Sequence, residues 1–326
     1  MSKVVAGIEF LEKKFNNKII NDTIPSKFIN WPIEILNIQA GGPIRSGRIY
    51  QMWGEESCGK TTMALLISLE AFKKGYRVLY FDTEGNLELE YFNMLGYDVK
   101  KYGKLFGVVT PTTTEQLKDM IKESINKDLF DMFIIDSIAG LSSTFELQLK
   151  EEDRGIGIFS NSITRLAKTI GPMLRIYNKF MFTTNQVRIK VNNWRVTEQP
   201  PGGNALKHFS SLRIKAAILE KTLKSITAGF VIDKSKISTP GLPGSYRIIY
   251  GKGFDKDYDK FQVMLAEGKI IENKAVKTSA KYQVVGAEIG KLHSADWIIE
   301  NIIRKSKINE SDTNTQNKKN NANSNN

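Results

Sequence analysis

A glycine-rich loop between an apolar segment and a helical segment most constrains how this chain can fold. Residues Gly54–Thr61 read Gly-Glu-Glu-Ser-Cys-Gly-Lys-Thr, the complete G-x-x-x-x-G-K-[ST] phosphate-binding pattern. The preceding Arg48–Trp53 is predicted to be a buried strand, and residues 62–74 have helical spacing. Such a loop directs backbone N–H groups and a helix N-terminus at bound phosphates. The sequence therefore predicts a nucleoside triphosphate site, in preference to a glycine turn that matches the motif by chance.

The loop and one later carboxylate define the predicted nucleotide contacts. Lys60 would place a positive charge beside the β- and γ-phosphates, and the Thr61 hydroxyl could bind Mg²⁺. Asp136 follows the apolar segment 132–135, where phosphate-loop proteins place a carboxylate that holds Mg²⁺, often through water. We therefore predict Thr61 and Asp136 as metal ligands. The predicted nucleotide contacts are Asp136 and the loop residues Gly54, Glu55, Glu56, Ser57, Cys58, Gly59, Lys60, Thr61 and Thr62.

Two carboxylates at the end of another predicted strand are candidates for the catalytic base. The strand 77–81 is followed by Asp82 and Glu84. Either carboxylate could polarise a water molecule that attacks the γ-phosphate. Alternatively, both could merely begin the next helix, where acidic residues suit the helix dipole. We favour Glu84, although position along the sequence does not decide between the two.

Net charge, cysteine content and the distribution of apolar residues bear on the partners and the location of the protein. The 326 residues carry a net charge of +12, which favours a polyanionic partner such as nucleic acid, although a generally basic, solvated surface would give the same balance. The single cysteine, Cys58, excludes an intrachain disulfide. Neither a signal peptide nor an apolar run of about 18 residues is evident, so we expect a cytoplasmic protein without membrane contact.

The chain is expected to contain four regions. Alternating strands and helices predict an α/β domain with a mostly parallel central sheet that helices cover on both faces. Its predicted strands include 77–81, 106–109, 132–135 and 179–183, and its predicted helices include 114–126 and 158–178. The C-terminal tail is rich in Asn, Ser, Thr and Lys, and we expect it to be disordered. The expected regions are an N-terminal helix and strand (1–30), the α/β domain (31–254), a small C-terminal α/β domain (255–305) and the tail (306–326).

Several segments together resemble the RecA family of recombinases. They are GEESCGKTT (54–62), Tyr80–Glu84, IIDSIAGL (134–141), and Asn185–Lys190 followed by Gly202–Lys207. The resemblance runs from about residue 7 to residue 272. It implies a RecA-type phosphate-loop NTPase core, with an N-terminal segment that supports polymerisation and a small C-terminal domain. It further implies a DNA-dependent ATPase that uses ATP and Mg²⁺.

The same resemblance implies partners for the chain. A RecA-like protein would form a homo-oligomeric helical filament on single-stranded DNA. It would catalyse homologous pairing and strand exchange with duplex DNA, in recombination and repair. Single-strand-binding and loader proteins are further expected partners.

The resemblance also assigns roles in the nucleotide site. It implies that Glu84 is the catalytic base, that Tyr91 stacks on the adenine and that Glu88 contacts the base. Considered alone, Tyr91 is one aromatic on a helix face, and such a residue more often belongs to the core than contacts a cofactor. Gln186 matches the residue that senses the γ-phosphate, and its amide can both donate and accept hydrogen bonds.

Two loops are implied to bind DNA. The second loop, 187–205, combines basic residues for phosphates, an aromatic for bases and glycines that allow close backbone approach. Its predicted contacts are Arg188, Lys190, Trp194, Gly202, Gly203 and Asn204. The first loop is placed near 146–158, with Lys150 and Arg154 as contacts. On composition alone, an ordinary mobile basic loop remains an alternative.

Several positions depart from the family pattern. Pro200 and Pro201 replace a threonine pair before the glycines, in a loop that is one residue shorter than usual. Glu55 stands where the family usually has proline, and Cys58 stands where it has serine.

Two lysines are predicted to act on a neighbouring subunit. If residues 230–237 form one strand, alternation places Lys234 and Lys236 on the same face. Adjacent ammonium groups repel each other, so an anion between them would explain their placement, as would a solvated strand face. The resemblance implies that this K-x-K segment before Pro240 reaches the γ-phosphate bound by the next subunit.

Two other functions remain to be weighed against the recombinase. A hexameric RecA-fold DNA helicase would share the ATP site, but the Gly202–Lys207 run and the N-terminal segment argue against it. A non-catalytic nucleotide-gated DNA-binding protein is the second alternative. The retention of Lys60, Thr61, Glu84 and Asp136 argues against that function.

Overall fold

A computed structural model describes residues 10, 13–14, 26–148, 157–192, 195–276, 279, 281–286 and 291–306, without the side chains of residues 189–197. Most of the expected N-terminal helix and strand (1–30) and nearly all of the predicted tail lie outside these residues. Lys150, Arg154 and Trp194 also lie outside them, and Lys190 is described only in its backbone.

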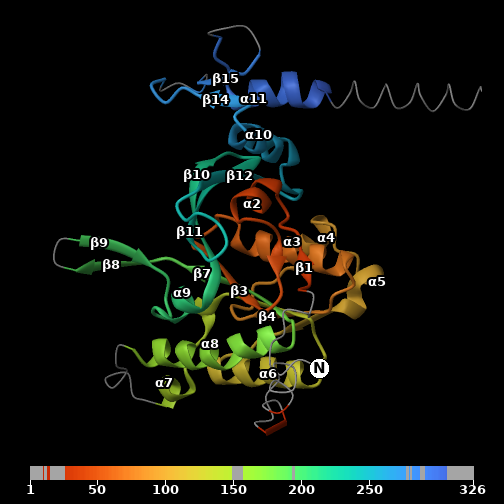
Figure 1. The fold of residues 1–326 in the computed structure, drawn as a ribbon, viewed down its shortest axis with the longest axis vertical. Helices are drawn as coiled ribbons and strands as arrows, with labels where there is room; N and C mark the ends of the chain where they lie inside the picture. Colours follow the sequence, from red (N-terminus) through yellow and green to blue (C-terminus); the bar gives the residue numbers. More distant parts are fainter. Residues whose placement is uncertain are drawn as a thin grey trace, which may run out of the picture.

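A sheet of nine strands forms the centre of the described chain (Figure 1). Its order is β13-β12-β11-β10-β3-β7-β6-β4-β5. Neighbouring strands from β10 to β5 run parallel, whereas β10, β11, β12 and β13 pair antiparallel. The prediction of an α/β fold with a mostly parallel sheet is therefore confirmed. The strands are β3 (Arg48–Gly54), β4 (Val78–Asp82), β5 (Phe106–Val109), β6 (Met132–Asp136), β7 (Phe180–Gln186), β10 (Ser210–Lys221), β11 (Ser225–Ser235), β12 (Pro243–Ile249) and β13 (Gly253–Phe254).

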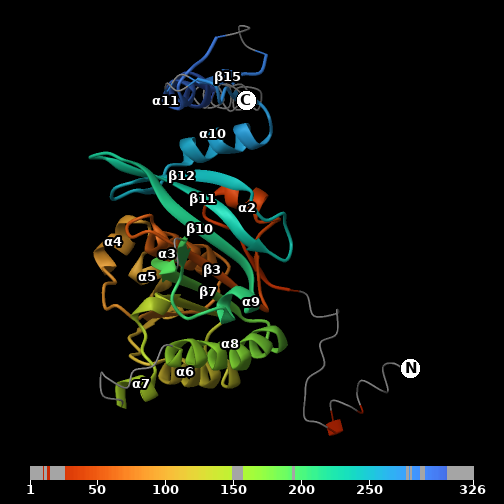
Figure 2. The ribbon, with the colours of Figure 1, turned by 90° about the vertical axis from the view of Figure 1, so that its left-hand side faces the viewer.

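Helices cover both faces because successive strand residues point in opposite directions. On β6, Met132 and Ile134 join one core cluster, whereas Phe133 and Ile135 join the other. Helices α6 and α8 pack together against the second face (Figure 2). No described helix is both long and apolar enough to cross a membrane. The covering helices are α2 (Glu34–Gln39), α3 (Lys60–Lys73), α4 (Leu89–Met94) and α5 (Val99–Tyr102) on the first face, and α6 (Thr114–Asn126), α8 (Ile158–Ile176) and α9 (Ala205–Phe209) on the second.

Most predicted elements of the core are observed within one to three residues of their expected limits. Helix α6 coincides with its prediction, and its start is fixed by Thr113, whose Oγ1 accepts from the Gln116 N–H at 3.2 Å. The predicted strand at 230–237 is wrong at both limits, because β11 covers Ser225–Ser235. Strands β10 and β12, which complete the antiparallel half of the sheet, had no counterpart among the predicted strands.

The parallel strands bring chemically active residues to one edge of the sheet. In the strand register, Gly54 lies beside Gln186, and Asp82 lies beside Asp136. All four residues end their strands, and parallel strands end at a common edge. That edge is where the phosphate loop leaves β3.

A buried ion cluster holds the opposite, amino-terminal edge of the same strands. Asp131 accepts from Arg77 Nε at 2.9 Å, from Lys27 Nζ at 3.2 Å and from Lys179 Nζ at 3.3 Å. Burial alone would raise the Asp131 pKa, but the Arg77 hydrogen bonds and the lysine charges outweigh it and lower that pKa. The cluster joins the starts of β4, β6 and β7 to the segment that precedes β1.

The C-terminal part builds a core of its own beyond the sheet edge (Figure 1). Tyr258, Phe261 and Ile299 belong to this third cluster. It is tied to α2 through Asp259, whose carboxylate accepts from the Glu34 and Ile35 N–H groups at 2.7 and 3.1 Å. The remaining described elements are α10 (Lys256–Ala266), β14 (Ile270–Glu272), β15 (Tyr282–Val284), α11 (Ala295–Ile298) with the π-helical turn Ile299–Arg304, α7 (Thr144–Gln148), the pair β1 (Phe28–Ile29) and β2 (Ile44–Arg45), two 3₁₀ turns at Gly103–Leu105 and Ile138–Gly140, and the pair β8 (Arg188–Asn192) and β9 (Arg195–Gln199).

Candidate nucleotide-binding site

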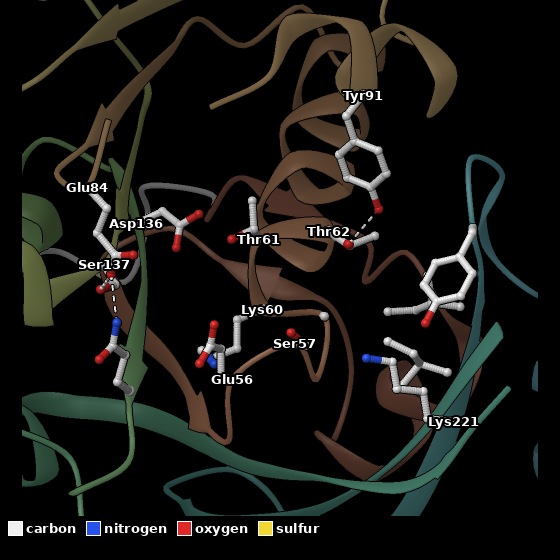
Figure 3. Close-up of a pocket in the computed structure, with 15 residues that line it drawn as sticks. Glu56, Ser57, Lys60, Thr61, Thr62, Glu84, Tyr91, Asp136, Ser137 and Lys221 are labelled. Atoms are coloured by element: carbon white, nitrogen blue, oxygen red, sulfur yellow. Dashed lines mark hydrogen bonds between the residues drawn. The ribbon is translucent and has the colours of Figure 1, made fainter. Parts of the chain in front are cut away.

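A pocket of about 400 Å³ lies at the carboxyl edge of the sheet (Figure 3). The phosphate loop and the ends of β4, β6 and β7 form one side, and β10, β11 and β12 form the other. The lining residues are Glu56, Ser57, Gly59, Lys60, Thr61, Thr62, Glu84, Tyr91, Asp136, Ser137, Gln186, Lys221, Ile226, Ile248 and Tyr250. Residues predicted from separate segments of the sequence, such as Lys60, Glu84 and Asp136, therefore meet in one pocket.

Two glycines of the phosphate loop are required by the space around them. A Cβ atom on Gly54 would lie 1.8 Å from the Ala216 carbonyl oxygen, and one on Gly59 would lie 2.2 Å from Ile248 Cδ1. Gly59 also has φ +91°, in the left-handed region, where it precedes the first turn of α3. The loop can therefore wrap tightly and present the start of α3 to the pocket.

Lys60 lies over the loop, and neighbouring strands hold the loop in place. Its Nζ donates to the carbonyl oxygens of Gly54 at 3.2 Å and Glu55 at 2.5 Å. The Glu55 carboxylate accepts from the Ile218 N–H at 2.9 Å, so this residue, which departs from the family pattern, anchors the loop to β10. Cys58 is fully buried, and its carbonyl accepts from the Tyr246 hydroxyl at 2.6 Å. Gly54, Glu55 and Cys58 thus support the loop and do not line the pocket.

The two candidate bases, Asp82 and Glu84, make different contacts in the structure. Both Asp82 oxygens accept backbone N–H groups, from Asn86 at 3.1 Å and Leu87 at 3.0 Å. Glu84 instead lines the pocket, and its Oε1 accepts from the Ser137 hydroxyl at 2.5 Å and from Gln186 Nε2 at 3.1 Å. Asp82 therefore shapes the turn that carries Glu84, and of the two carboxylates only Glu84 lines the pocket.

Asp136 and Thr61 fit a magnesium ion that arrives with a nucleotide. The Asp136 oxygens accept from the Tyr80 hydroxyl at 2.6 Å and from Thr184 Oγ1 at 2.5 Å, which fixes the carboxylate. Burial and then the charge of Asp136 raise the Tyr80 pKa well above its usual range, so Tyr80 remains a donor. The described residues contain no cluster of three or more His, Cys, Asp or Glu side chains for a metal. A hydroxyl and one carboxylate suit Mg²⁺, which takes its other ligands from phosphates and water.

Tyr91 lines the pocket, whereas Glu88 does not. The Tyr91 hydroxyl lies 2.8 Å from Thr62 Oγ1, within hydrogen-bonding distance. This contact places the tyrosine ring beside the first turn of α3 (Figure 3). Glu88 is exposed at the N-terminus of α4, where its carbonyl accepts from the Phe92 N–H at 3.1 Å. The predicted base contact by Glu88 thus has no support from the pocket lining.

Five lining residues were not identified from the sequence: Ser137, Lys221, Ile226, Ile248 and Tyr250. Ser137 directly follows Asp136, and that adjacency was the available signal. The other four lie on or beside β10, β11 and β12, which the sequence analysis did not pair with the phosphate loop. The antiparallel pairing of β10, β11 and β12, over about 30 residues, brings these four residues to the pocket. No local sequence motif predicts that pairing.

Lys234 does not line the pocket of its own chain. Its Nζ donates to the carbonyl oxygens of Lys207, His208 (2.8 Å) and Ser210 (2.9 Å), at the end of α9. Burial and then the positive charge of Lys236 lower the Lys234 pKa. Lys234 is therefore held by the end of α9, the helix that follows the second predicted DNA loop.

Lys236 lies one residue beyond β11, contrary to the predicted single strand. Ser235 ends the strand because its Oγ accepts from the N–H groups of Ile237 at 3.0 Å and Ser238 at 2.7 Å. The alternation used to place both lysines on one face therefore does not extend to Lys236.

The second predicted DNA loop forms an antiparallel hairpin of β8 and β9, which projects from the sheet (Figure 1). Arg188 is exposed at its base. Gly203 and Asn204 are exposed on the return segment, whereas Gly202 is buried against Ile163, which a Cβ on Gly202 would approach to 3.3 Å. Core packing thus explains the glycine at 202.

The hairpin root borders a second, polar pocket of about 240 Å³. Glu198 of β9 pairs with Lys215 of β10 at 2.6 Å, and buried Arg213 pairs with Asp233 at 3.1 Å. The Trp53 ring lies 5.4 Å from both the Lys215 and Arg213 cationic groups. The ion pair of Glu198 with Lys215 fastens the hairpin to the central sheet.

Comparison with known proteins identifies the relatives of this chain. A family model described as the RecA N-terminal domain matches residues 17–255. Protein RecA of Pseudomonas putida is 29% identical over 276 residues, which cover 82% of this chain and 75% of that protein. Protein RecA of Thermotoga neapolitana is 30% identical over 230 residues, which cover 69% of this chain and 64% of that protein.

Among solved structures, the RadB recombinase is similar, with a TM-score of 0.54 and 22% identity. The match covers 68% of this chain and 96% of that chain. At this identity the likeness shows the fold alone. It confirms the predicted RecA-type α/β core.

Proposed function

Since the chain belongs to the RecA family, we propose that it is a DNA-dependent ATPase that forms helical filaments on single-stranded DNA. In such a filament it would catalyse homologous pairing and strand exchange in recombination and repair. One observation carries this proposal. The base candidate Glu84 is hydrogen-bonded to Gln186, which ends β7 only two residues before the hairpin that carries the predicted DNA contacts.

The pocket supplies the groups that ATP hydrolysis needs. Lys60 would exchange its loop carbonyls for the β- and γ-phosphate oxygens, and α3 would direct N–H groups at them. Mg²⁺, held by Thr61 and Asp136, would neutralise charge on the phosphates. Glu84 would orient and deprotonate the attacking water.

A short path connects the nucleotide to the DNA hairpin. Asn185 is fully buried, and its Nδ2 donates to the Pro201 carbonyl on the return segment of the loop, at 3.0 Å. Its Oδ1 accepts from the Gln186 N–H at 3.0 Å. A phosphate that draws the Gln186 amide away from Glu84 would therefore also bias the position of both ends of the loop.

The basic loop residues would contact DNA chiefly through its backbone. The exposure of Arg188 at the hairpin base supports this role. We assign the same role to Lys190, Trp194, Gly203 and Asn204, with Lys150 and Arg154 in the first loop. Binding would depend strongly on salt concentration and weakly on base sequence.

Neighbouring subunits would complete the active site. Lys234 and Lys236 do not line their own chain's pocket, which supports a role at the γ-phosphate bound by the next subunit. Such lysines would stabilise transition-state charge only when subunits dock. We further propose that residues 1–30 add to the adjacent subunit and that residues 255–305 form a separate small domain.

ATP hydrolysis with and without DNA tests the function. Wild-type protein should hydrolyse ATP several-fold faster when single-stranded DNA is added, and Lys60→Ala should be inactive in both conditions because no other loop charge reaches the transferring phosphate. Hydrolysis that is unchanged by DNA, or that survives in Lys60→Ala, would contradict the proposal.

A further inference from the structure

Lys221 is a cation of the nucleotide pocket for which the phosphate-loop motif does not account. It lines the pocket with Ile226, Ile248 and Tyr250, on the wall built by the antiparallel strands. Figure 3 shows its side chain across the pocket from Glu84, with Nζ directed inward. The pocket therefore holds one lysine from the loop and a second from the facing wall.

A β-bulge explains why Lys221 points into the pocket. Ile218 pairs with Ala228, and Lys221 pairs with Ile226, so three residue steps on β10 match two on β11. Directly opposed residues in a sheet share a face, and a regular strand would have put Lys221 on the face opposite Ile218. The extra residue, Leu219, reverses the alternation and places Lys221 on the pocket face beside Ile226.

Beyond the bulge, hydrogen bonds fix the turn that joins β10 to β11. Thr222 N–H donates to the Ser225 carbonyl at 2.9 Å, and Thr222 Oγ1 accepts from the Lys224 and Ser225 N–H groups at 3.2 and 3.0 Å. The Tyr250 N–H donates to the Lys224 carbonyl at 3.1 Å, which joins the turn to the end of β12. The backbone that carries Lys221 is thus fixed relative to the pocket.

Within the described part of the chain, the exposed Lys221 side chain makes no hydrogen bond or ion pair with another residue, whereas Lys60 Nζ donates to two carbonyls. Glu84, which accepts a hydrogen bond from Gln186, lies on the side of the pocket assigned to the γ-phosphate, and Lys60 lies between Glu84 and Lys221 (Figure 3). Lys221 lies with Tyr250 and Ile226 at the other end. A lone ammonium in that position matches the non-bridging oxygens of a phosphate close to the nucleoside.

We propose that Lys221 binds the α- and β-phosphates of the nucleotide held by the same chain. This inference rests on the proposed ATPase function and adds a phosphate contact from the β10–β11 hairpin. Because ADP carries both phosphates, Lys221 would stabilise bound ATP and bound ADP to a similar degree. It would therefore act on nucleotide affinity and KM, and it would leave the kcat of the chemical step unchanged.

Equilibrium binding to purified full-length variants tests this role. Lys221→Met is compared with Lys221→Arg and with Lys224→Met, which removes an exposed lysine from the same turn. Dissociation constants for ATP, ADP and adenosine are measured by competition with a fluorescent ADP. Lys221→Met should bind ATP and ADP about fivefold to tenfold more weakly, with adenosine binding unchanged. Lys221→Arg should retain most of the affinity, and Lys224→Met should match the wild type. At saturating ATP, kcat on single-stranded DNA should stay unchanged in Lys221→Met.

Three results would overturn the assignment, and they are distinguishable. If the wild type binds ATP and Lys221→Met binds it equally well, this inference fails and the proposed function stands. If adenosine binding falls as much as ADP binding, the substitution has changed the pocket and not a phosphate contact. If the wild type binds neither ATP nor ADP, the proposed function fails together with this inference.

Discussion

The side-chain amide of Gln186 donates a hydrogen bond to the Glu84 carboxylate at 3.1 Å. Gln186 ends β7 and Glu84 follows β4, and the strand order places β6 between these two strands. Ser137, which directly follows β6, also donates to Glu84 Oε1. The Glu84 carboxylate is therefore bonded both to the residue after β6 and to the last residue of β7. The candidate base is thus joined directly to the strand that leads into the predicted DNA hairpin.

Gln186→Ala should separate nucleotide binding from its effect on DNA. The pocket would keep Lys60, Thr61 and Asp136, so ATP affinity should change little. The ATP-dependent increase in affinity for single-stranded DNA should be lost, because no amide connects the γ-phosphate to the hairpin. Fluorescence anisotropy of a labelled oligonucleotide, with and without a slowly hydrolysed ATP analogue, measures this. Gln262→Ala, in α10, is the matched control. A normal ATP response in Gln186→Ala would contradict the switch.

Glu84→Gln should bind ATP but hydrolyse it at least about 100-fold more slowly, because the amide cannot accept a proton from water. Single-turnover hydrolysis on single-stranded DNA gives the rate, and filter binding checks nucleotide occupancy. Glu90→Gln, an exposed carboxylate on α4, should retain wild-type turnover. A wild-type rate in Glu84→Gln would mean that another residue is the base.

The two lysines should act only across a subunit interface. Lys234→Ala/Lys236→Ala protein and Glu84→Gln protein should each be nearly inactive alone. An equal mixture pairs an intact base with intact lysines at about one interface in four, since each subunit presents a different face to each neighbour. ATPase activity should therefore recover to as much as about a quarter of the wild-type rate. Continued inactivity of a mixture whose co-assembly is confirmed would refute the assignment in trans.

The Asp131 cluster should make stability depend on pH. The cluster lowers the Asp131 pKa, so its contribution is fully present above the unfolded value of about 3.9 and is lost as the pH falls below it. Asp131→Ala leaves Lys179 buried without this partner and should cost about 3 kcal/mol at pH 7. Urea unfolding at pH 7 and at pH 3 measures both effects. The difference in unfolding free energy between Asp131→Ala and the wild type should be smaller at pH 3 than at pH 7.

A matched control identifies what is specific to the cluster. Asp119 is exposed on α6, and Asp119→Ala should change the unfolding free energy by no more than about 0.5 kcal/mol at either pH. Equal effects of the Asp131 and Asp119 substitutions would show that the buried cluster contributes nothing particular to stability.

The sequence predicts one half of the site well because its signals are local. A contiguous motif identifies Gly54–Thr61, and short apolar runs that end in carboxylates identify β4 and β6. Parallel pairing then necessarily brings Glu84 and Asp136 to the loop. The family resemblance adds Gln186 and Tyr91, and the structure places both in the same pocket.

The other half depends on pairing that a single segment does not encode. Lys221 faces the pocket only because Leu219 forms a bulge, and a bulge is invisible until the register of β10 and β11 is known. Ser235 ends β11 through a side-chain turn that the alternating pattern of residues 230–237 concealed. In both cases one residue changes the direction of its neighbours, and period-two patterns cannot detect that.

Electron microscopy of the protein with single-stranded DNA and a slowly hydrolysed ATP analogue tests the central claim most directly. The account predicts continuous helical filaments that cover the DNA and require the nucleotide, with Lys60→Ala protein failing to form them. Closed rings on DNA, or DNA bound without ordered assembly in the presence of nucleotide, would contradict it.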